Sequence, residues 1–280
     1  MPGDAIPSGR PKLAEEHIFD FLAHAPFTKA VLINPIVLGQ PIEEIGPTLI
    51  NALADLRDRY QVQRVTITTP TVARLIRESL PEFKITASVL MGIATPAQVL
   101  AVRDLVDVIV PDTRLYRNLP QLQHLRQIFA GEVRLMVNES CLPGCLFRNQ
   151  HFYEMAYSKF MPHSLCDETL RQYPWLRLTS GWILPQHLHY YTGLYDSLKI
   201  SGRVTLRDPQ RYLKVLGAYI QGRPLMPTEI GGGPASVIES IGITDTLFEH
   251  LLNCNKDCLS CKYCENQYRQ LTSAARQVTT

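Results

Sequence analysis

Residues 29–60 contain the pattern that decides the fold. The first six, KAVLIN (29–34), form a short apolar run that stops at Asn34-Pro35, as a buried strand does. IEEIGPTLINALADLRDRY (42–60) follows, with apolar residues at spacings of three and four, the period of an amphipathic helix. The stretch therefore predicts one strand and one helix, the unit from which parallel α/β sheets are built.

The same unit recurs along most of the chain. Six further strands are expected over residues 64–69, 83–90, 107–112, 132–139, 176–183 and 197–200. Helices are expected after them from Pro70, near Pro96, and over 119–129, 145–159, 186–193 and 208–222. Seven strand–helix units favour a (β/α) barrel over an open doubly wound sheet, for which no nucleotide-binding fingerprint is present.

The beginning of the chain lacks a first strand. Residues 1–26 offer one helix (15–24) with no strand ahead of it. The fold class predicted is thus α/β, a TIM-like (β/α) barrel incomplete at the N-terminus; the barrel is open, the chain begins late, or a partner completes it. The expected division is 1–28 as an N-terminal segment with the first barrel helix, 29–222 as the barrel, and 223–280 as a loop and Cys-rich metal-binding tail.

Composition narrows the function classes. Hydrophobic residues make up 45% and charged residues 19%, which predicts a packed globular core. The net charge of +2 gives no general reason to expect nucleic acid as the main partner. Because the chain shows neither a signal peptide nor an apolar run long enough to span a membrane, a cytoplasmic protein is expected.

Four cysteines crowd into eleven residues near the end of the chain. Cys254, Cys258, Cys261 and Cys264 form a C-x3-C-x2-C-x2-C array, and an odd total of seven cysteines cannot all form disulfides within one chain. Short loops let four thiolates converge on one centre, which favours a [4Fe-4S] cluster over zinc. The first three also match the C-x3-C-x2-C spacing of radical S-adenosylmethionine enzymes, although that motif normally follows the first barrel strand.

A second group of polar and sulfur-bearing residues follows the expected strand at 132–139. Side chains at the carboxyl ends of barrel strands face the shared pocket, and Pro143-Gly144 allows a turn between the first two cysteines. Its cysteines are expected to hold a second cluster, to share one cluster with the tail, or to be buried thiols. The group comprises Asn138, Glu139, Cys141, Cys145, Arg148 and His151, with Cys166 further along.

A basic pattern ends the last expected strand. Lys199, Ser201 and Arg203 occupy alternate positions and so project from one face. They indicate either a site for an anionic substrate at the barrel mouth or a solvated strand end. His187 and His189 lack a third metal-ligating partner nearby in the sequence and are expected to be structural.

The motifs LKISGR (198–203) and VNESC (137–141), in this cysteine-rich context, resemble the collagenase-like peptidase family U32. The corresponding family motif is Leu-Lys-Ile-Glu-Gly-Arg, so Ser201 replaces an acidic residue here. The resemblance implies a TIM-like barrel. Several relatives of this family use a [4Fe-4S] cluster for oxygen-independent, prephenate-using hydroxylation of ubiquinone precursors or RNA bases, so the resemblance also implies such a cluster here.

These observations lead to an iron–sulfur enzyme that modifies an anionic small molecule, RNA or peptide by redox chemistry, with a partner barrel subunit or a redox protein as candidate partners. The alternatives are a peptidase, a non-catalytic iron–sulfur or zinc subunit, and a radical S-adenosylmethionine enzyme. Glu139, Lys199 and Arg203 are the expected catalytic residues, and Asn138, Arg148, His151 and Ser201 are expected to bind substrate.

Overall fold

The computed structural model describes residues 23–33, 35, 38–139, 141–142, 144–156, 165–201, 209–225 and 244–278. The chain forms two compact units. Unit 1 contains Met1–Asp112, Gln127–Val133 and Arg148–Pro162, and unit 2 contains Thr113–Arg126, Arg134–Phe147 and His163–Thr280. Across the described ranges, no helix is long and apolar enough to cross a membrane.

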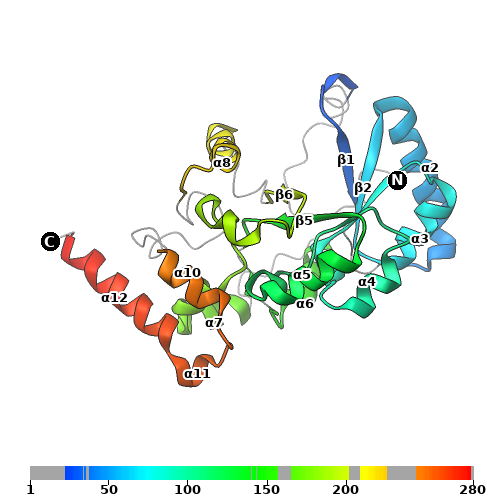
Figure 1. The fold of residues 1–280 in the computed structure, drawn as a ribbon. Helices are drawn as coiled ribbons and strands as arrows, with labels where there is room; N and C mark the ends of the chain where they lie inside the picture. Colours follow the sequence, from blue (N-terminus) through cyan, green and yellow to red (C-terminus); the bar gives the residue numbers. More distant parts are fainter. Residues whose placement is uncertain are drawn as a thin grey trace. The chain divides into compact units, whose positions relative to one another are not determined.

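The described strands form one parallel sheet in sequential order, β1-β2-β3-β4-β5-β6. Figure 1 labels β1, β2, β5 and β6. A sequential parallel order is that of a (β/α) barrel rather than of a doubly wound sheet, whose order reverses. The expected incomplete α/β barrel is confirmed at this level. The strands are β1 (Lys29–Ile33), β2 (Val62–Ile67), β3 (Lys84–Ala87), β4 (Val108–Ile109), β5 (Glu132–Met136) and β6 (Ser197–Lys199).

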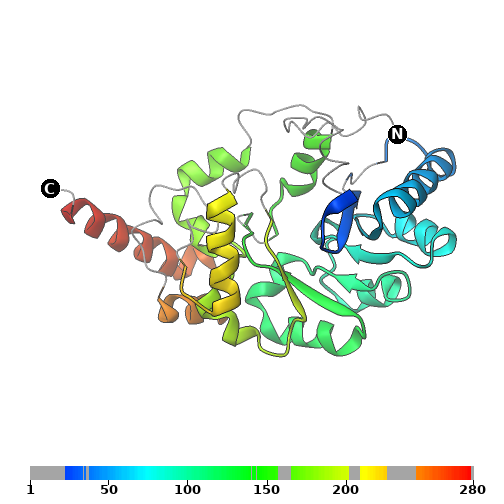
Figure 2. The same ribbon diagram turned by 90° about the horizontal axis from the view of Figure 1, so that it is seen from above.

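In unit 1, helices alternate with β1 to β4. Figure 2 shows α2 and α3 (blue and cyan) beside the strands of this unit. Thr69 caps α3 by accepting a hydrogen bond from the backbone of Val72, and Thr95 with Gln98 forms a capping box at α4. The helices of unit 1 are α2 (Ile42–Tyr60), α3 (Pro70–Ser79), α4 (Pro96–Val102) and α6 (Arg148–Ala156), with the 3-10 helix η2 (Val89–Met91).

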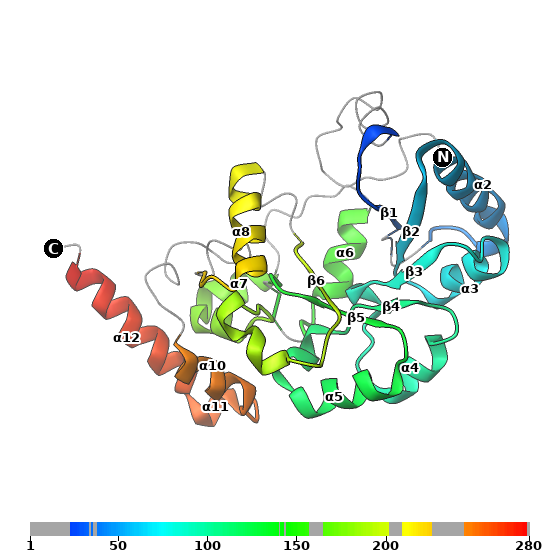
Figure 3. The same ribbon diagram turned by 45° about the horizontal axis from the view of Figure 1, so that its top comes forward.

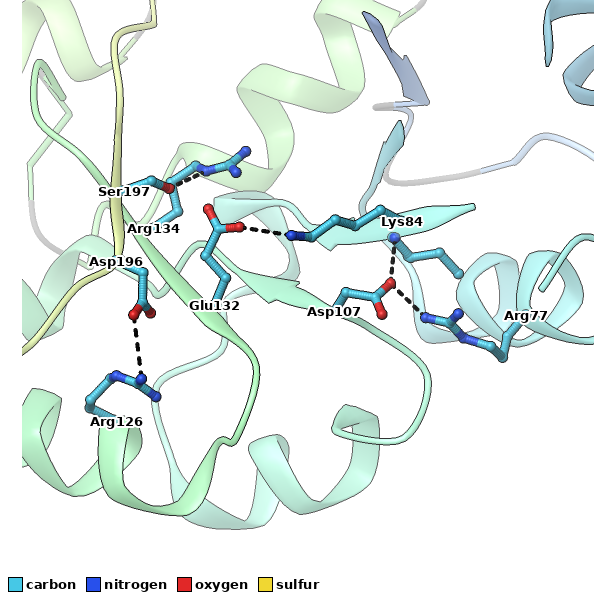
Figure 4. A network of polar contacts seen from close by, with 9 residues as sticks. Arg77, Lys84, Asp107, Arg126, Glu132, Arg134, Asp196 and Ser197 are labelled. Atoms are coloured by element: carbon cyan, nitrogen blue, oxygen red, sulfur yellow. Dashed lines mark hydrogen bonds and ion pairs between the residues drawn. The ribbon is translucent and has the colours of Figure 1, made fainter. Parts of the chain in front are cut away.

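The amino ends of the unit 1 strands are tied by charged side chains (Figure 4). Asp107 precedes β4, and its Oδ2 accepts hydrogen bonds from Arg77 Nη2 and from the backbone N–H of Ile85, both at 2.7 Å. Lys84 Nζ at the start of β3 donates to Glu132 Oε2 at the start of β5 at 3.1 Å. Since catalytic residues of barrels gather at the carboxyl ends, these contacts belong to stability.

Unit 2 has corresponding contacts near the start of β6. Arg134 Nε donates to Ser197 Oγ at 2.8 Å, and Arg126 Nη2 lies 3.4 Å from Asp196 Oδ1 (Figure 4). These contacts fix the register in which Arg134 faces Ser197.

Short helices make up most of the rest of unit 2. In the C-terminal part, α10, α11 and α12 follow one another closely (Figure 3), and α12 packs against η4 while α10 packs against η3. The elements are η3 (Thr113–Arg117), α5 (Leu119–Ile128, whose end reaches into unit 1), α7 (Leu165–Gln172), η4 (Pro174–Thr179), η5 (Pro185–Tyr191), α8 (Pro209–Gln221), α10 (Asp245–Leu252), α11 (Cys258–Cys261) and α12 (Tyr263–Val278).

A buried arginine lies at the centre of unit 2. Arg117 is 4% exposed, and its guanidinium donates to the carbonyls of Ser180 and Trp182 and to the hydroxyl of Tyr191. Its Cζ lies 4.9 Å from the ring centroid of Trp182 and 4.6 Å from that of Phe248 on α10. The positive charge of Arg117 is stabilised by carbonyl oxygens and aromatic rings instead of a carboxylate. Through these contacts the side chain connects η3 with the segment around residue 181 and with α10.

One strand prediction was wrong. Residues 176–183 form no strand: Pro174 opens the 3-10 helix η4, and Thr179 Oγ1 donates to the carbonyl of Leu176 inside it. The predicted helix at 186–193 is likewise the 3-10 helix η5. Alternating apolar residues indicate a buried segment, but here the residues are buried without strand pairing. Among the described contacts, the backbone N–H of Ile183 donates to the carbonyl of Val137, just beyond the end of β5.

Candidate functional site

The carboxyl ends of β5 and β6 are locked together by one side chain. Asn138 Oδ1 accepts from the backbone N–H of Ser201 at 2.7 Å and from its hydroxyl at 3.1 Å, while Asn138 Nδ2 donates to the Ser201 carbonyl at 2.6 Å. The amide thus continues the strand pairing that ends at Met136 and Lys199. These contacts make Asn138 a residue that positions Ser201, and both were expected to bind substrate.

Glu139 connects this strand end to the first cysteine. Its carboxylate is 8% exposed, and Oε1 accepts from the backbone N–H of Cys141 at 3.0 Å. The backbone N–H of Cys145 donates to the carbonyl of Leu142 at 3.0 Å, with Gly144 at φ 67°. Glycine suits this left-handed position, so the expected turn brings Cys141 and Cys145 onto one short loop of unit 2.

The other predicted residues lie on different elements. Cys166 lies on α7 of unit 2, and Arg148 and His151 lie on α6 of unit 1. Lys199 is the last residue of β6, half-buried, and its carbonyl accepts from the backbone of Val137 at 3.0 Å. Arg203 lies outside the described residues.

The tail cysteines are connected by two unusual backbone turns. Lys256 has φ 65° and Lys262 has φ 50°, in the left-handed region that non-glycine residues seldom occupy. The Lys256 N–H donates to Cys254 Sγ at 3.2 Å, and Lys262 separates Cys261 from Cys264. Each turn thus lies between two cysteines of the array.

Burial and, to a smaller extent, neighbouring cysteines raise the pKa of two of these thiols. Burial raises the pKa of Cys264 to about 12, with smaller contributions from the neighbouring thiols of Cys254, Cys258 and Cys261. Burial also raises the pKa of Cys258, again with Cys254 and Cys261 contributing. Thiolates that oppose one another's ionisation are the groups that a bound cation would stabilise.

The donor set suits a metal, although a finished coordination sphere is not formed. Over the described ranges, no three Cys, His, Asp or Glu side chains are arranged as a metal-holding group. The tail nevertheless offers four soft sulfur donors and one backbone N–H directed at a sulfur, the kind of contact that tunes iron–sulfur centres. By residue type alone, these donors would suit either a [4Fe-4S] cluster or zinc.

Comparison with known proteins gives two matches and no matching family model. The uncharacterized protease MJ1657 of Methanocaldococcus jannaschii is 25% identical over 283 residues, which cover 93% of this chain and 83% of that protein. The structure of the U32 peptidase Mk0906 matches with a TM-score of 0.50 and 17% identity, over 69% of this chain and 78% of the other. The chain resembles the U32 peptidases. The family resemblance drawn from the sequence is confirmed, and the structural match concerns the fold.

Three polar residues at strand ends of unit 1 escaped prediction. Thr68 and Ser88 directly follow β2 and β3, and Asp112 follows β4 by three positions; they are 6%, 2% and 8% exposed. The Thr68 hydroxyl donates to the carbonyl of Pro35 at 2.7 Å, and Ser88 Oγ accepts from the backbone N–H of Leu90 at 3.3 Å. The signal was available, because each is a polar residue that ends an apolar run.

The candidate functional residues thus fall into three groups, each described within its own unit. Unit 1 has buried polar residues at the ends of β2 to β4. Unit 2 has the Asn138–Ser201 lock with the Cys141–Cys145 loop, and the four-cysteine tail. Strand-end polar groups are suited to binding and proton transfer, and sulfur donors to holding a metal.

Proposed function

We propose that this U32 relative is an iron–sulfur enzyme that modifies an anionic substrate by redox chemistry, of the kind represented by oxygen-independent hydroxylation. A [4Fe-4S] cluster would be held by Cys254, Cys258, Cys261 and Cys264. The observation that carries the proposal is the hydrogen bond from the Lys256 N–H to Cys254 Sγ, at a backbone position that a lysine seldom adopts.

The tail geometry supports this assignment through its electrostatic balance. Burial, with smaller contributions from neighbouring cysteines, raises the pKa of Cys258 and Cys264 and so opposes their ionisation. A multivalent iron–sulfur core removes that penalty, because its positive charge stabilises thiolates. When bound, such a cluster supplies one-electron transfer.

Substrate is assigned to the carboxyl ends of β5 and β6. Lys199 would attract an anionic group, Glu139 would hold or accept a proton, and Asn138 would keep Ser201 in place. Arg203 is retained in this proposal on its sequence motif alone. Cys141, Cys145 and Cys166 are proposed to bind a second cluster near this substrate.

The metal assignment is tested by anaerobic purification followed by iron, sulfide and zinc analysis and an EPR spectrum of the reduced protein. The proposal expects about four iron and four sulfide per cluster, as the cluster type requires. Cys258→Ser should remove the tail cluster, and Cys145→Ser should leave the tail signal in place. Stoichiometric zinc without sulfide would instead assign the tail to a structural zinc site.

A peptidase is the second candidate, favoured by the names of both relatives. It predicts cleavage of an unfolded peptide by metal-free protein, with loss of cleavage in a variant of the responsible residue. Glu139→Gln is the first variant to compare, because Glu139 is a buried carboxylate at a strand end. Cleavage by cluster-free protein that E139Q abolishes would favour the peptidase over the redox enzyme.

A further inference from the structure

Unit 1 contains a pocket at the opposite ends of its strands from the candidate site. The pocket has a volume of about 460 Å³ and lies where β2 and β3 begin. That volume falls in the range of small-molecule sites. Its lining residues are Thr28, Arg57, Gln63, Arg64, Glu82, Phe83 and Lys84.

Two of the three cations in this lining are already neutralised. Arg57 pairs with Asp58 at 2.7 Å and with Glu82, and these carboxylates hold its guanidinium in place. Lys84 Nζ pairs with Glu132 at 3.1 Å, as Figure 4 shows. The third cation, Arg64, is half-buried and makes no side-chain hydrogen bond or ion pair with any residue that the structure describes.

The unmatched charge lies directly beside another cation. Arg64 and Lys84 are Cα partners across the parallel strands β2 and β3, so their side chains leave the sheet on the same face. Like charges at neighbouring strand positions destabilise a sheet. Arg57 takes two of the nearby carboxylates and Lys84 takes the third, so Arg64 has no carboxylate partner among the described residues, which departs from what stability alone favours.

We infer that this pocket binds a phosphate-bearing small molecule. A phosphate dianion would supply the anionic partner that Arg64 lacks, and the planar guanidinium of Arg64 can donate two parallel hydrogen bonds to it. Thr28 and Gln63 add neutral donors at the wall. The pocket has room for more than the phosphate group, and Phe83 adds an apolar side chain to its lining.

This site is separate from the proposed catalytic centre in both position and chemistry. It lies at the amino ends of β2 and β3 in unit 1, whereas the candidate site uses carboxyl ends of strands. It needs neither a cluster nor any cysteine. Its test therefore stands whether or not the iron–sulfur proposal holds.

Calorimetric titration of the full chain with inorganic phosphate, pyrophosphate and citrate tests the inference. We expect saturable binding of phosphate or pyrophosphate that Arg64→Gln weakens about tenfold or more, because a charge-assisted bidentate contact is lost. Arg103→Gln is the matched control. This exposed arginine directly follows α4 of the same unit and pairs with Asp104 at 3.8 Å, so its loss should leave the affinity unchanged.

A second measurement separates a ligand site from a structural arginine. Without ligand, R64Q should be as stable as the parent protein or more so, since the substitution removes a like-charge neighbour; a structural Arg64 would lose stability instead. Equal phosphate affinity in the parent protein and R64Q would overturn the inference. So would binding of citrate alone, or no saturable binding of either phosphate probe.

Discussion

Phe248 of α10 stacks face to face on the buried imidazole of His187, with ring centroids 3.9 Å apart and an interplanar angle of 17°. The guanidinium of Arg117 also lies against this ring, and Phe248 is fully buried. The side chain of Phe248 therefore packs α10 against His187 and Arg117. Helix α10 directly precedes the four-cysteine tail.

Phe248→Ala should destabilise unit 2 by about 3–5 kcal/mol, the usual effect of removing a buried aromatic ring. The substitution also removes the aromatic ring that the guanidinium of Arg117 contacts. Denaturant unfolding followed by near-UV circular dichroism measures the effect. Ile220→Ala on α8, at a position 76% exposed, is the matched control and should change stability by less than about 0.5 kcal/mol.

His187 predicts a pH dependence of stability. Burial lowers its pKa from 6.5 to about 4; nearby Asp245 opposes this shift, whereas Arg117 and His189 reinforce it. Because the folded-state pKa lies below the unfolded value, the contribution is fully present above pH 6.5 and is lost as the pH falls toward 4. Between these two pH values, the free energy of unfolding should fall by an amount on the order of 3 kcal/mol.

His187→Phe should flatten this part of the pH profile, since the replacement ring cannot be protonated. Unfolding free energies measured between pH 4 and pH 8, the window set by the shift, give the comparison. His189→Phe is the control, because His189 lies on the same 3-10 helix but is exposed. An unchanged slope in H187F would mean that other groups set the acid sensitivity.

Much of the first unit was predictable because its local signals agree with its tertiary structure. Helix α2 runs over Ile42–Tyr60 as the spacing of apolar residues indicated, and α3 and α4 begin at the predicted prolines. Residues 176–183 failed because their apolar residues are buried without strand pairing, and periodicity cannot distinguish these cases.

The candidate site was predictable in its residue types and less so in their roles. The polar end of the strand that became β5 indicated Asn138 and Glu139, but the sequence could not show that Asn138 is engaged by Ser201, sixty-three positions away. Nor did it single out Arg117, whose partners are backbone carbonyls and aromatic rings of distant segments. The metal role of the cysteines stays a prediction.

Asn138→Ala should cost about 1–3 kcal/mol of stability, because the backbone of Ser201 loses its partners at the end of β6. Ser201→Ala removes only the hydroxyl contact of 3.1 Å and should cost less. Hydrogen exchange of the Ser201 amide reports the difference directly: it should accelerate in N138A and stay slow in S201A. Equal exchange in both would contradict the locking role.

Lys262→Gly tests the strained turn of the tail. Glycine accepts φ 50° without a steric penalty, so this substitution should be neutral or stabilise the metal-free protein by up to about 1 kcal/mol. Lys214→Gly, inside α8, is the comparison and should destabilise by about 1 kcal/mol. Thermal unfolding of both variants measures the contrast, and a destabilised K262G would argue against backbone strain at this turn.

The most direct test of the central claim is the iron, sulfide and zinc content of the anaerobically purified full chain, measured beside its Cys258→Ser variant. We expect iron and acid-labile sulfide in equal amounts, an EPR signal on reduction, and loss of the tail cluster's iron and sulfide in C258S. Zinc alone, or a chain that binds no metal after reconstitution with iron and sulfide, would contradict it.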